Sequence, residues 1–193
     1  MAGAIIDSTS QSWLTPPDIL RAVREVLGPI DLDPCASTTG WTDPKIAYTG
    51  PRAWGGNGLD GLTEPWWGSG IKNFYVNPPY GRTEPHPEIM GGKATTIAMW
   101  LKKCSDATKM GTREGIALVP ASVESKYWFQ HVWGSAASVC FFRGRLRFWI
   151  KGEDRIPRRG KSCIVKPIAA IYYGPDPTRF IAVFSKLGHI VAT

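Results

Sequence analysis

The apolar run Phe74-Tyr75-Val76 leads directly into Asn77-Pro78-Pro79-Tyr80, and this junction limits the possible fold more than any other feature. Proline fixes the backbone φ angle and donates no hydrogen bond, so a β-strand has to end at the two prolines. The carbonyls of Asn77 and Pro78 are then left as acceptors. Two carbonyls, an amide and an aromatic ring suit a planar amino group on an unstacked base. The structural alternative is a Pro-Pro turn that only closes a strand.

A second motif, Ile30-Asp31-Leu32-Asp33-Pro34-Cys35-Ala36-Ser37, has its Asp33 placed 44 positions before Asn77. It begins like a strand and breaks into small residues, as a strand does when it opens a turn. Small side chains let a ligand approach the backbone, and carboxylates at strand ends can hold hydroxyls or an ammonium group. An acidic turn with a proline is the structural alternative.

The periodicity of the chain predicts one alternating α/β domain over residues 1–193. Residues 38–70 are rich in glycine, proline and tryptophan and show little periodicity. We expect helices at 16–27, 93–110, 125–133 and 177–187. We expect strands at 30–33, 73–76, 116–119, 139–142, 146–150, 168–173 and 189–192, with 139–142 and 146–150 paired as a hairpin.

These elements predict a Rossmann-like, mostly parallel sheet with an antiparallel hairpin near the C-terminal end and helices on both faces. Ligands of such sheets bind beyond the carboxyl ends of the strands, where the strand order switches. Asp33 and Asn77 are therefore expected to face the same crevice.

The two motifs together resemble those of S-adenosylmethionine-dependent amino-methyltransferases, specifically the phage-type DNA N6-adenine methyltransferases. The first motif lacks the glycines usual at its turn, whereas the second keeps the full tetrapeptide. The resemblance extends over about residues 13–148. The matching segments are Trp13-Leu14-Thr15-Pro16, Asp33-Pro34-Cys35-Ala36-Ser37, Gly61-Leu62 with Trp66, Asn77 to Tyr80, Val119-Pro120-Ala121 and Gly144 to Phe148.

This resemblance implies a class I methyltransferase fold, S-adenosylmethionine as cofactor and methyl transfer to adenine N6 in DNA. The flipped adenine would stack on Tyr80, with Asn77 and Pro78 accepting from N6. Asp60 is expected at the adenine amino group of the cofactor, and Asp31 or Asp33 at its methionine or ribose part. The catalytic residues implied are Asn77, Pro78, Pro79 and Tyr80; the cofactor-binding residues are Thr15, Pro16, Asp31, Asp33, Pro34, Ala36, Ser37 and Asp60.

Two other readings stay open. The same tetrapeptide would serve methylation of another amino group, namely cytosine N4, guanine N2 or a glutamine amide of a protein. A non-catalytic DNA-binding homologue could also have kept the fold. A phage or prophage origin, in the cytoplasm of a bacterial host and with or without a partner restriction enzyme, is what the resemblance suggests.

The charge of the chain is uneven: 23 basic residues against 16 acidic ones give a formal net charge of +7. Residues 143–161 contain eight basic and two acidic residues. Such a block suits a polyanion, here double-stranded DNA, although a soluble basic loop is the simpler alternative. The predicted DNA contacts are Arg143, Arg145, Lys151, Arg155, Arg158, Arg159 and Lys161.

Three patterns are absent from the sequence. Four widely spaced cysteines and three histidines show no zinc-ligand spacing, which predicts free thiols and no metal. No apolar run is long enough for a transmembrane helix, and residues 1–10 lack a signal-peptide pattern, so we expect no membrane partner and a cytoplasmic protein. Oligomeric state has no signature in the sequence.

Overall fold

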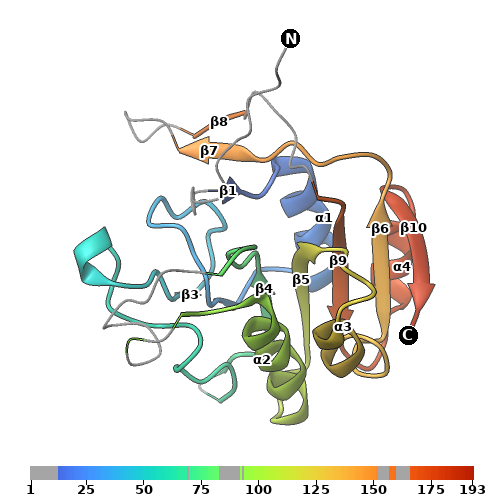
Figure 1. The fold of residues 1–193 in the computed structure, drawn as a ribbon, viewed down its shortest axis with the longest axis horizontal. Coiled ribbons are helices and arrows are strands. Elements are labelled where there is room, and N and C mark those ends of the chain that lie inside the picture. The colour runs from blue at the N-terminus through green and yellow to red at the C-terminus, as the bar shows by residue number, and fades with distance from the viewer. Residues whose placement is uncertain (1–12, 69, 83–91, 93, 152–156, 160–165) are drawn as a thin grey trace.

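A seven-stranded sheet with helices on both faces forms the body of the protein (Figure 1). The computed structural model describes residues 13–68, 70–82, 92, 94–151, 157–159 and 166–193. The strand order is β10-β6-β9-β5-β4-β2-β3. The pairs β3–β2, β2–β4 and β4–β5 are parallel, and β9 runs antiparallel between β5 and β6. The strands are β2 (Leu32–Asp33), β3 (Ile46–Ala47), β4 (Asn73–Val76), β5 (Glu114–Pro120), β6 (Ser138–Phe142), β9 (Ile168–Tyr173) and β10 (Gly188–Ala192).

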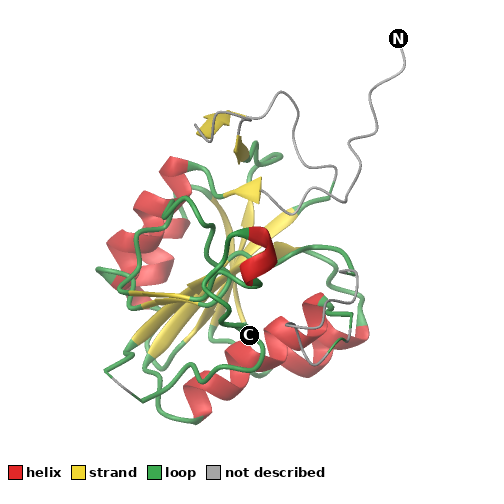
Figure 2. Cartoon of the chain, turned by 90° about the vertical axis from the view of Figure 1, so that its left-hand side faces the viewer, coloured by secondary structure: helices red, strands yellow, loops and turns green. Residues whose placement is uncertain are grey.

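Helices cover the sheet on both sides (Figure 2). α1 (Pro17–Leu27) and α4 (Thr178–Phe184) contact each other on one face, and α2 (Ile97–Lys109) contacts α3 (Lys126–His131) on the other. α1 begins with proline in its first turn and ends at Gly28, whose φ of 75° favours a residue without a Cβ. A short 3₁₀ helix, η1 (Arg52–Trp54), lies in the glycine-rich stretch that showed no periodicity.

Alternation along the strands divides the core into two clusters. In β4, Phe74 and Val76 pack with α2 and α3, whereas Tyr75 between them packs with α1 and α4. The same period of two recurs in β5, where Ala117 and Val119 alternate with Ile116. All of these strand residues are fully buried, so both faces of the sheet are apolar as expected when helices cover each side.

A second, three-stranded sheet lies at the upper end of the molecule in Figure 1. It has the order β1-β7-β8 and is antiparallel throughout, with β1 at Trp13–Leu14, β7 at Trp149–Lys151 and β8 at Pro157–Arg159. Its register pairs Trp13 with Ile150 and Leu14 with Trp149. β1 is thereby tied to the basic region more than 130 positions later.

The predicted α/β class, the mostly parallel main sheet and the predicted helices are confirmed, but the predicted hairpin is wrong. β6 pairs with β9 and β10, whereas β7 belongs to the small sheet and residues 146–148 are not a strand. The backbone N–H of Arg143 donates to Leu187, and Phe148 is fully buried. The chain therefore leaves the main sheet after Phe142 instead of turning back on it. Cys35, Cys104 and Cys140 are free thiols; Cys163 lies outside the described residues.

Candidate functional site

The Asn77 side chain is held at both ends of its amide. Its Nδ2 donates to the main-chain carbonyl of Trp13 at 3.1 Å, and its Oδ1 accepts from the Tyr80 hydroxyl at 2.8 Å. Asn77 directly follows β4, so it lies at the carboxyl end of a central parallel strand, and the two bonds fix its side chain there. The sequence predicted Asn77 and Tyr80 at this position, but not the contact with Trp13.

Three aromatic rings line up beside this amide. The Phe148 ring centroid lies 6.0 Å from that of Tyr80 and 6.0 Å from that of Trp13, and both contacts are edge-to-face. Phe148 is fully buried, whereas Trp13 and Tyr80 keep part of their surface exposed. Phe148 therefore packs against one edge of this aromatic group, and Trp13 and Tyr80 are the members that remain partly exposed.

The residues between β1 and α1, Thr15 and Pro16, pack near the end of β4. The hydroxyls of Thr15 and Tyr75 lie 2.7 Å apart, and the Trp41 indole N–H donates to the Thr15 carbonyl at 2.7 Å. Thr15 and Pro16 are both buried. The bond with Tyr75 brings Thr15 next to the Asn77 turn, and the bond from Trp41 holds Thr15 there. The sequence did not single out Tyr75 or Trp41.

Asp33 is a buried carboxylate at the end of β2. One oxygen accepts from the Cys35 backbone N–H at 3.0 Å, and the other accepts from the Thr42 hydroxyl at 2.5 Å. Burial raises the pKa of Asp33 from its usual 3.8 to about 6, although both hydrogen bonds act in the lowering direction. Thr42 orients this carboxylate and was missed, since a threonine in a loop carries no distinguishing pattern.

Asp60 and Gly61 pack against the turn that follows Asp33. A Cβ on Gly61 would lie 1.9 Å from the Pro34 carbonyl oxygen, so the two backbone segments meet only because residue 61 is glycine. Asp60 is buried, and its Oδ1 accepts from the Leu62 backbone N–H at 3.0 Å. Burial raises the pKa of the Cys35 thiol, and the charges of Asp33 and Asp60 raise it further. Asp33, Asp60 and this turn therefore form one acidic region.

Replacing Gly61 with alanine should open this region. The added Cβ has to displace the backbone at Pro34, an overpacking that costs about 1–3 kcal/mol of folding free energy. Thermal melts measure this loss, and we expect a lower melting temperature than that of the parent. Gly81→Ala is the stability control, because its Cβ would meet nothing within 4 Å. Equal melting temperatures for the parent and Gly61→Ala would contradict this close contact between the two backbone segments.

Asp31 is not part of this arrangement. Its carboxylate accepts from Lys45 Nζ at 2.6 Å and from the backbone N–H groups of Lys72 and Asn73 at 3.0 and 3.3 Å. Burial opposes ionisation, but Lys45 and these N–H groups hold the pKa of Asp31 below its usual value. The contacts lie at the amino end of β4, about 13 Å along the strand from Asn77. These contacts tie β2 to β4 through the Asp31 carboxylate. A contact between Asp31 and a cofactor stays a prediction.

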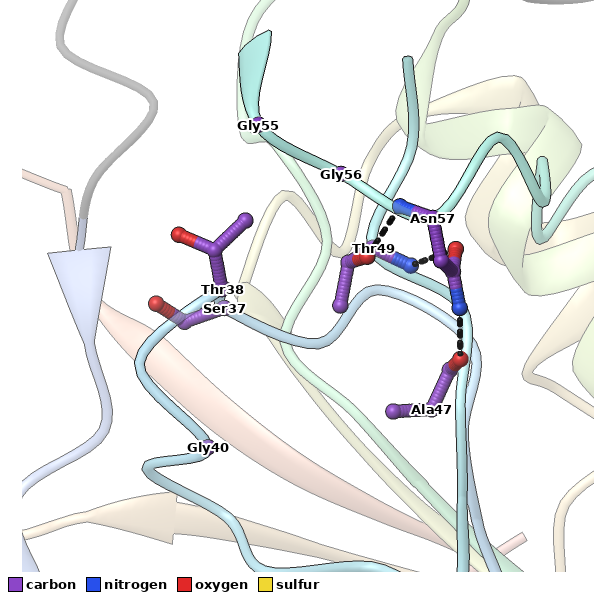
Figure 3. Close-up of a pocket in the computed structure, with 8 residues that line it drawn as sticks. All are labelled: Ser37, Thr38, Gly40, Ala47, Thr49, Gly55, Gly56 and Asn57. Atoms are coloured by element: carbon purple, nitrogen blue, oxygen red, sulfur yellow. Dashed lines mark hydrogen bonds between the residues drawn. The ribbon is translucent and has the colours of Figure 1, made fainter. Parts of the chain in front are cut away.

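A shallow groove of about 320 Å³ opens beyond the ends of β2 and β3 (Figure 3). Ser37 and Thr38 lie on one side of it, Thr49 and Asn57 lie on the other, and Gly55 and Gly56 close one end. Asn57 is fixed by bonds with Thr49 and with the Ala47 carbonyl. Of the predicted cofactor residues, Ser37 lines this groove, and Ala36 is buried behind it with its N–H bonded to the Tyr48 carbonyl.

The predicted DNA-contacting residues divide into three groups. Arg143, Arg145 and Arg159 are exposed, while Lys151 and Arg158 belong to β7 and β8. Arg155 and Lys161 lie outside the described residues. Because β7 pairs with β1, and β1 contacts Asn77, part of the basic region lies beside the Asn77 turn.

The model of one protein family, described as DNA N-6-adenine-methyltransferase (Dam), matches residues 3–175. The chain belongs to this family. The match covers both motifs, the small sheet and most of the main sheet, so the predicted membership and activity class are confirmed. DNA is therefore the substrate class of the family, and a methyl donor is implied.

No curated protein and no solved structure matches the chain. Among the described residues, no helix is long and apolar enough to cross a membrane. Within the same part of the chain, no cluster of three or more histidine, cysteine or acidic side chains is arranged to hold a metal ion.

Proposed function

We propose that this family member transfers the methyl group of S-adenosylmethionine to N6 of adenine in double-stranded DNA, with Asn77 and Tyr80 at the base and Asp33 at the cofactor. The observation that carries the proposal is the parallel pairing of β2 with β4, with Leu32 opposite Phe74. It puts the turn after Asp33 and the turn after Val76 at the same edge of the sheet, where ligands of such sheets bind.

At the base, Asn77 and Pro78 supply the acceptors. The Asn77 Oδ1 already accepts from Tyr80, but an amide oxygen has two lone pairs and can accept from N6 as well. The Pro78 carbonyl accepts the second N6 hydrogen, and the Tyr80 ring stacks on the base. These bonds orient the N6 lone pair and stabilise the charge that develops on it, so catalysis comes from positioning and electrostatics. Pro79 stiffens the turn that presents these groups.

At the cofactor, the donor set fits S-adenosylmethionine. Asp33 and Asp60 are buried carboxylates suited to an ammonium or amino group. The groove beyond the ends of β2 and β3 offers the hydroxyls of Ser37, Thr38 and Thr49. Its volume of about 320 Å³ is at the small end of the range for small-molecule sites. When bound, S-adenosylmethionine supplies an electrophilic methyl group. Thr15, Pro16, Pro34 and Ala36 would shape the wall between the cofactor and the base.

Two alternatives predicted from the sequence lead to different products. A cytosine N4, guanine N2 or glutamine amide substrate would use the same acceptors, and a non-catalytic homologue would give no product. The exposed arginines at 143, 145 and 159 favour a nucleic acid over a protein substrate. The phage origin, the bacterial cytoplasm and a partner nuclease rest on the sequence resemblance alone.

The deciding experiment is mass spectrometry of nucleosides from unmethylated duplex DNA incubated with the protein and S-adenosylmethionine labelled with deuterium in its methyl group. We expect labelled N6-methyladenine, which identifies the base, the atom and the donor together. Labelled N4-methylcytosine or N2-methylguanine would keep the mechanism and change the substrate. No labelled nucleoside, on DNA containing every short sequence context, would contradict the proposal.

Replacing Arg145 and Arg159 with glutamine should weaken DNA binding and flatten its salt dependence. Each lost phosphate contact reduces the slope of log K against log salt by about 0.9, so the pair should reduce it by about 2. Fluorescence anisotropy over a salt series measures the slope. Arg113→Gln is the matched control, since Arg113 is exposed but lies at the opposite end of the sheet, before β5. A slope equal to the parent's in the double variant would place the DNA surface elsewhere.

A further inference from the structure

We propose that the Asn77 amide is held in its reacting orientation by a two-point clamp, the Trp13 main-chain carbonyl on Nδ2 and the Tyr80 hydroxyl on Oδ1. The small sheet β1-β7-β8 would then be part of the catalytic apparatus as well as a DNA-contacting surface. The inference rests on the proposed function, because it assigns positioning roles for the same reaction.

The two bonds act on opposite ends of one amide. The Trp13 carbonyl accepts at 3.1 Å and the Tyr80 hydroxyl donates at 2.8 Å, so rotation of the side chain breaks one bond or both. Only the carbonyl oxygen of Asn77 can accept from N6, and the Nδ2 bond with Trp13 turns that oxygen away from Trp13 and toward Tyr80. An amide oriented before the base arrives needs no reorganisation during the reaction, which is where preorganised groups contribute most.

Tyr80 is a reliable donor in this clamp. Burial raises the pKa of its hydroxyl well above the usual value, so the proton is kept throughout the working pH range. The edge-to-face contact with Phe148 sets the direction of the ring, and Phe148 is itself fixed by burial and by Trp13. The hydroxyl therefore serves a purpose separate from stacking, which needs only the ring face.

The other half of the clamp depends on the small sheet. The described part of β1 is two residues long, Trp13 and Leu14, and it pairs with β7. A two-residue strand has little stability without a partner, so the pairing with Ile150 and Trp149 helps to hold the Trp13 carbonyl in place. β7 pairs in turn with β8, where the exposed Arg159 lies opposite Trp149. A phosphate contact at Arg159 would therefore act on the clamp through β8 and β7.

Tyr80→Phe tests the hydroxyl directly, because it keeps the ring. Single-turnover methylation at saturating DNA and cofactor should slow about fivefold, the effect of one lost hydrogen bond. The dissociation constants for duplex DNA and for S-adenosylmethionine should stay at the parent values. A parent-like rate at saturation would overturn the clamp, as would a change confined to DNA affinity.

Ile150→Pro tests the small sheet. Ile150 is 39% exposed and its side chain adds little, but proline removes a backbone N–H from the central strand. We expect a lower rate at saturating DNA in addition to weaker DNA binding, whereas Ile150→Thr keeps the N–H and the strand propensity. Equal saturating rates for the two variants would show that the sheet affects binding only, and would overturn its positioning role. If the proline variant does not fold, Tyr80→Phe decides alone.

The two proposals fail in different ways. No methylation of any base by the parent protein overturns the proposed function, and the positioning role with it. Methylation by the parent together with a full-rate Tyr80→Phe variant overturns the clamp and leaves the proposed function in place.

Discussion

Asn77→Ala should lower the rate of methyl transfer by about 100-fold or more, the usual effect of removing one preorganised hydrogen-bond partner from an active site. The variant loses the acceptor for N6 and also releases Tyr80 and the Trp13 carbonyl, which the amide holds together. Affinity for S-adenosylmethionine should change little, because Asp33 and Asp60 do not contact Asn77 through any described hydrogen bond. Single-turnover methylation and calorimetric titration of the cofactor measure the two quantities.

Asn73→Ala is the matched control for this variant, because Asn73 is an asparagine at the other end of the same strand. Its Oδ1 accepts from the Asp31 backbone N–H at 2.9 Å, and its Nδ2 donates to the carbonyls of Leu27 and Pro29. Losing these buried bonds should cost about 3 kcal/mol of folding free energy, while the rate per folded molecule stays near that of the parent. Near-parent turnover in Asn77→Ala, or a rate loss in Asn73→Ala, would contradict the assignment of the site to the carboxyl end of β4.

Asp33→Asn should weaken cofactor binding and yet stabilise the fold at pH 8. The pKa of Asp33 is about 6 in the folded protein against a usual 3.8, so the folded state holds this proton more tightly than the unfolded state. The stabilising contribution of the proton is complete below about pH 3.8 and is lost as the pH rises through 6. Asparagine keeps the size and one acceptor oxygen without the buried charge, and the Thr42 hydroxyl can turn to accept from the new Nδ2. The gain at pH 8 is therefore at most about 3 kcal/mol.

The pH dependence makes this prediction specific. Urea melts of parent and variant should differ most above pH 6, and the difference should shrink as the pH falls toward 4. Cofactor affinity should fall at least about tenfold at pH 8, because a charge-assisted bond to an ammonium group is lost. A variant less stable than the parent at pH 8, or a difference that is the same at every pH, would show that burial of this charge is not what shifts the pKa.

Much of the fold was predictable because its signals are local. The helix over 16–27 is specified by prolines at its start, an apolar face and Gly28 at its end, and α1 begins and ends within a residue of that range. The strand at 168–173 was predicted at the bounds that β9 has. Both depend on backbone chemistry and on side-chain period, which are properties of a short window of sequence.

The predicted hairpin failed because strand pairing is not local. Arg143-Gly144-Arg145 has the turn residues of a hairpin, and Gly144 does adopt a φ of 78°. The strand before this turn, β6, nevertheless pairs with β9 and β10. Phe148 is buried against Trp13 and Tyr80, and the strand that follows it, β7, joins the small sheet instead of pairing with β6. Which of several possible partners a strand takes depends on the free energy of the whole packed core.

The sequence by itself determined that a strand ends at Asn77-Pro78-Pro79-Tyr80, that an acidic turn lies at Asp33, and that the charge concentrates in 143–161. Proline stereochemistry, strand period and charge can be read from the sequence without knowing which residues contact one another in the fold. The tertiary structure alone decided that the Asp31 carboxylate bonds to Lys45 and to the start of β4, whereas the Asp33 carboxylate bonds to Cys35 and Thr42. It alone placed the Trp13 carbonyl on Asn77, because that bond joins residues 64 positions apart and forms only when the sheets are packed.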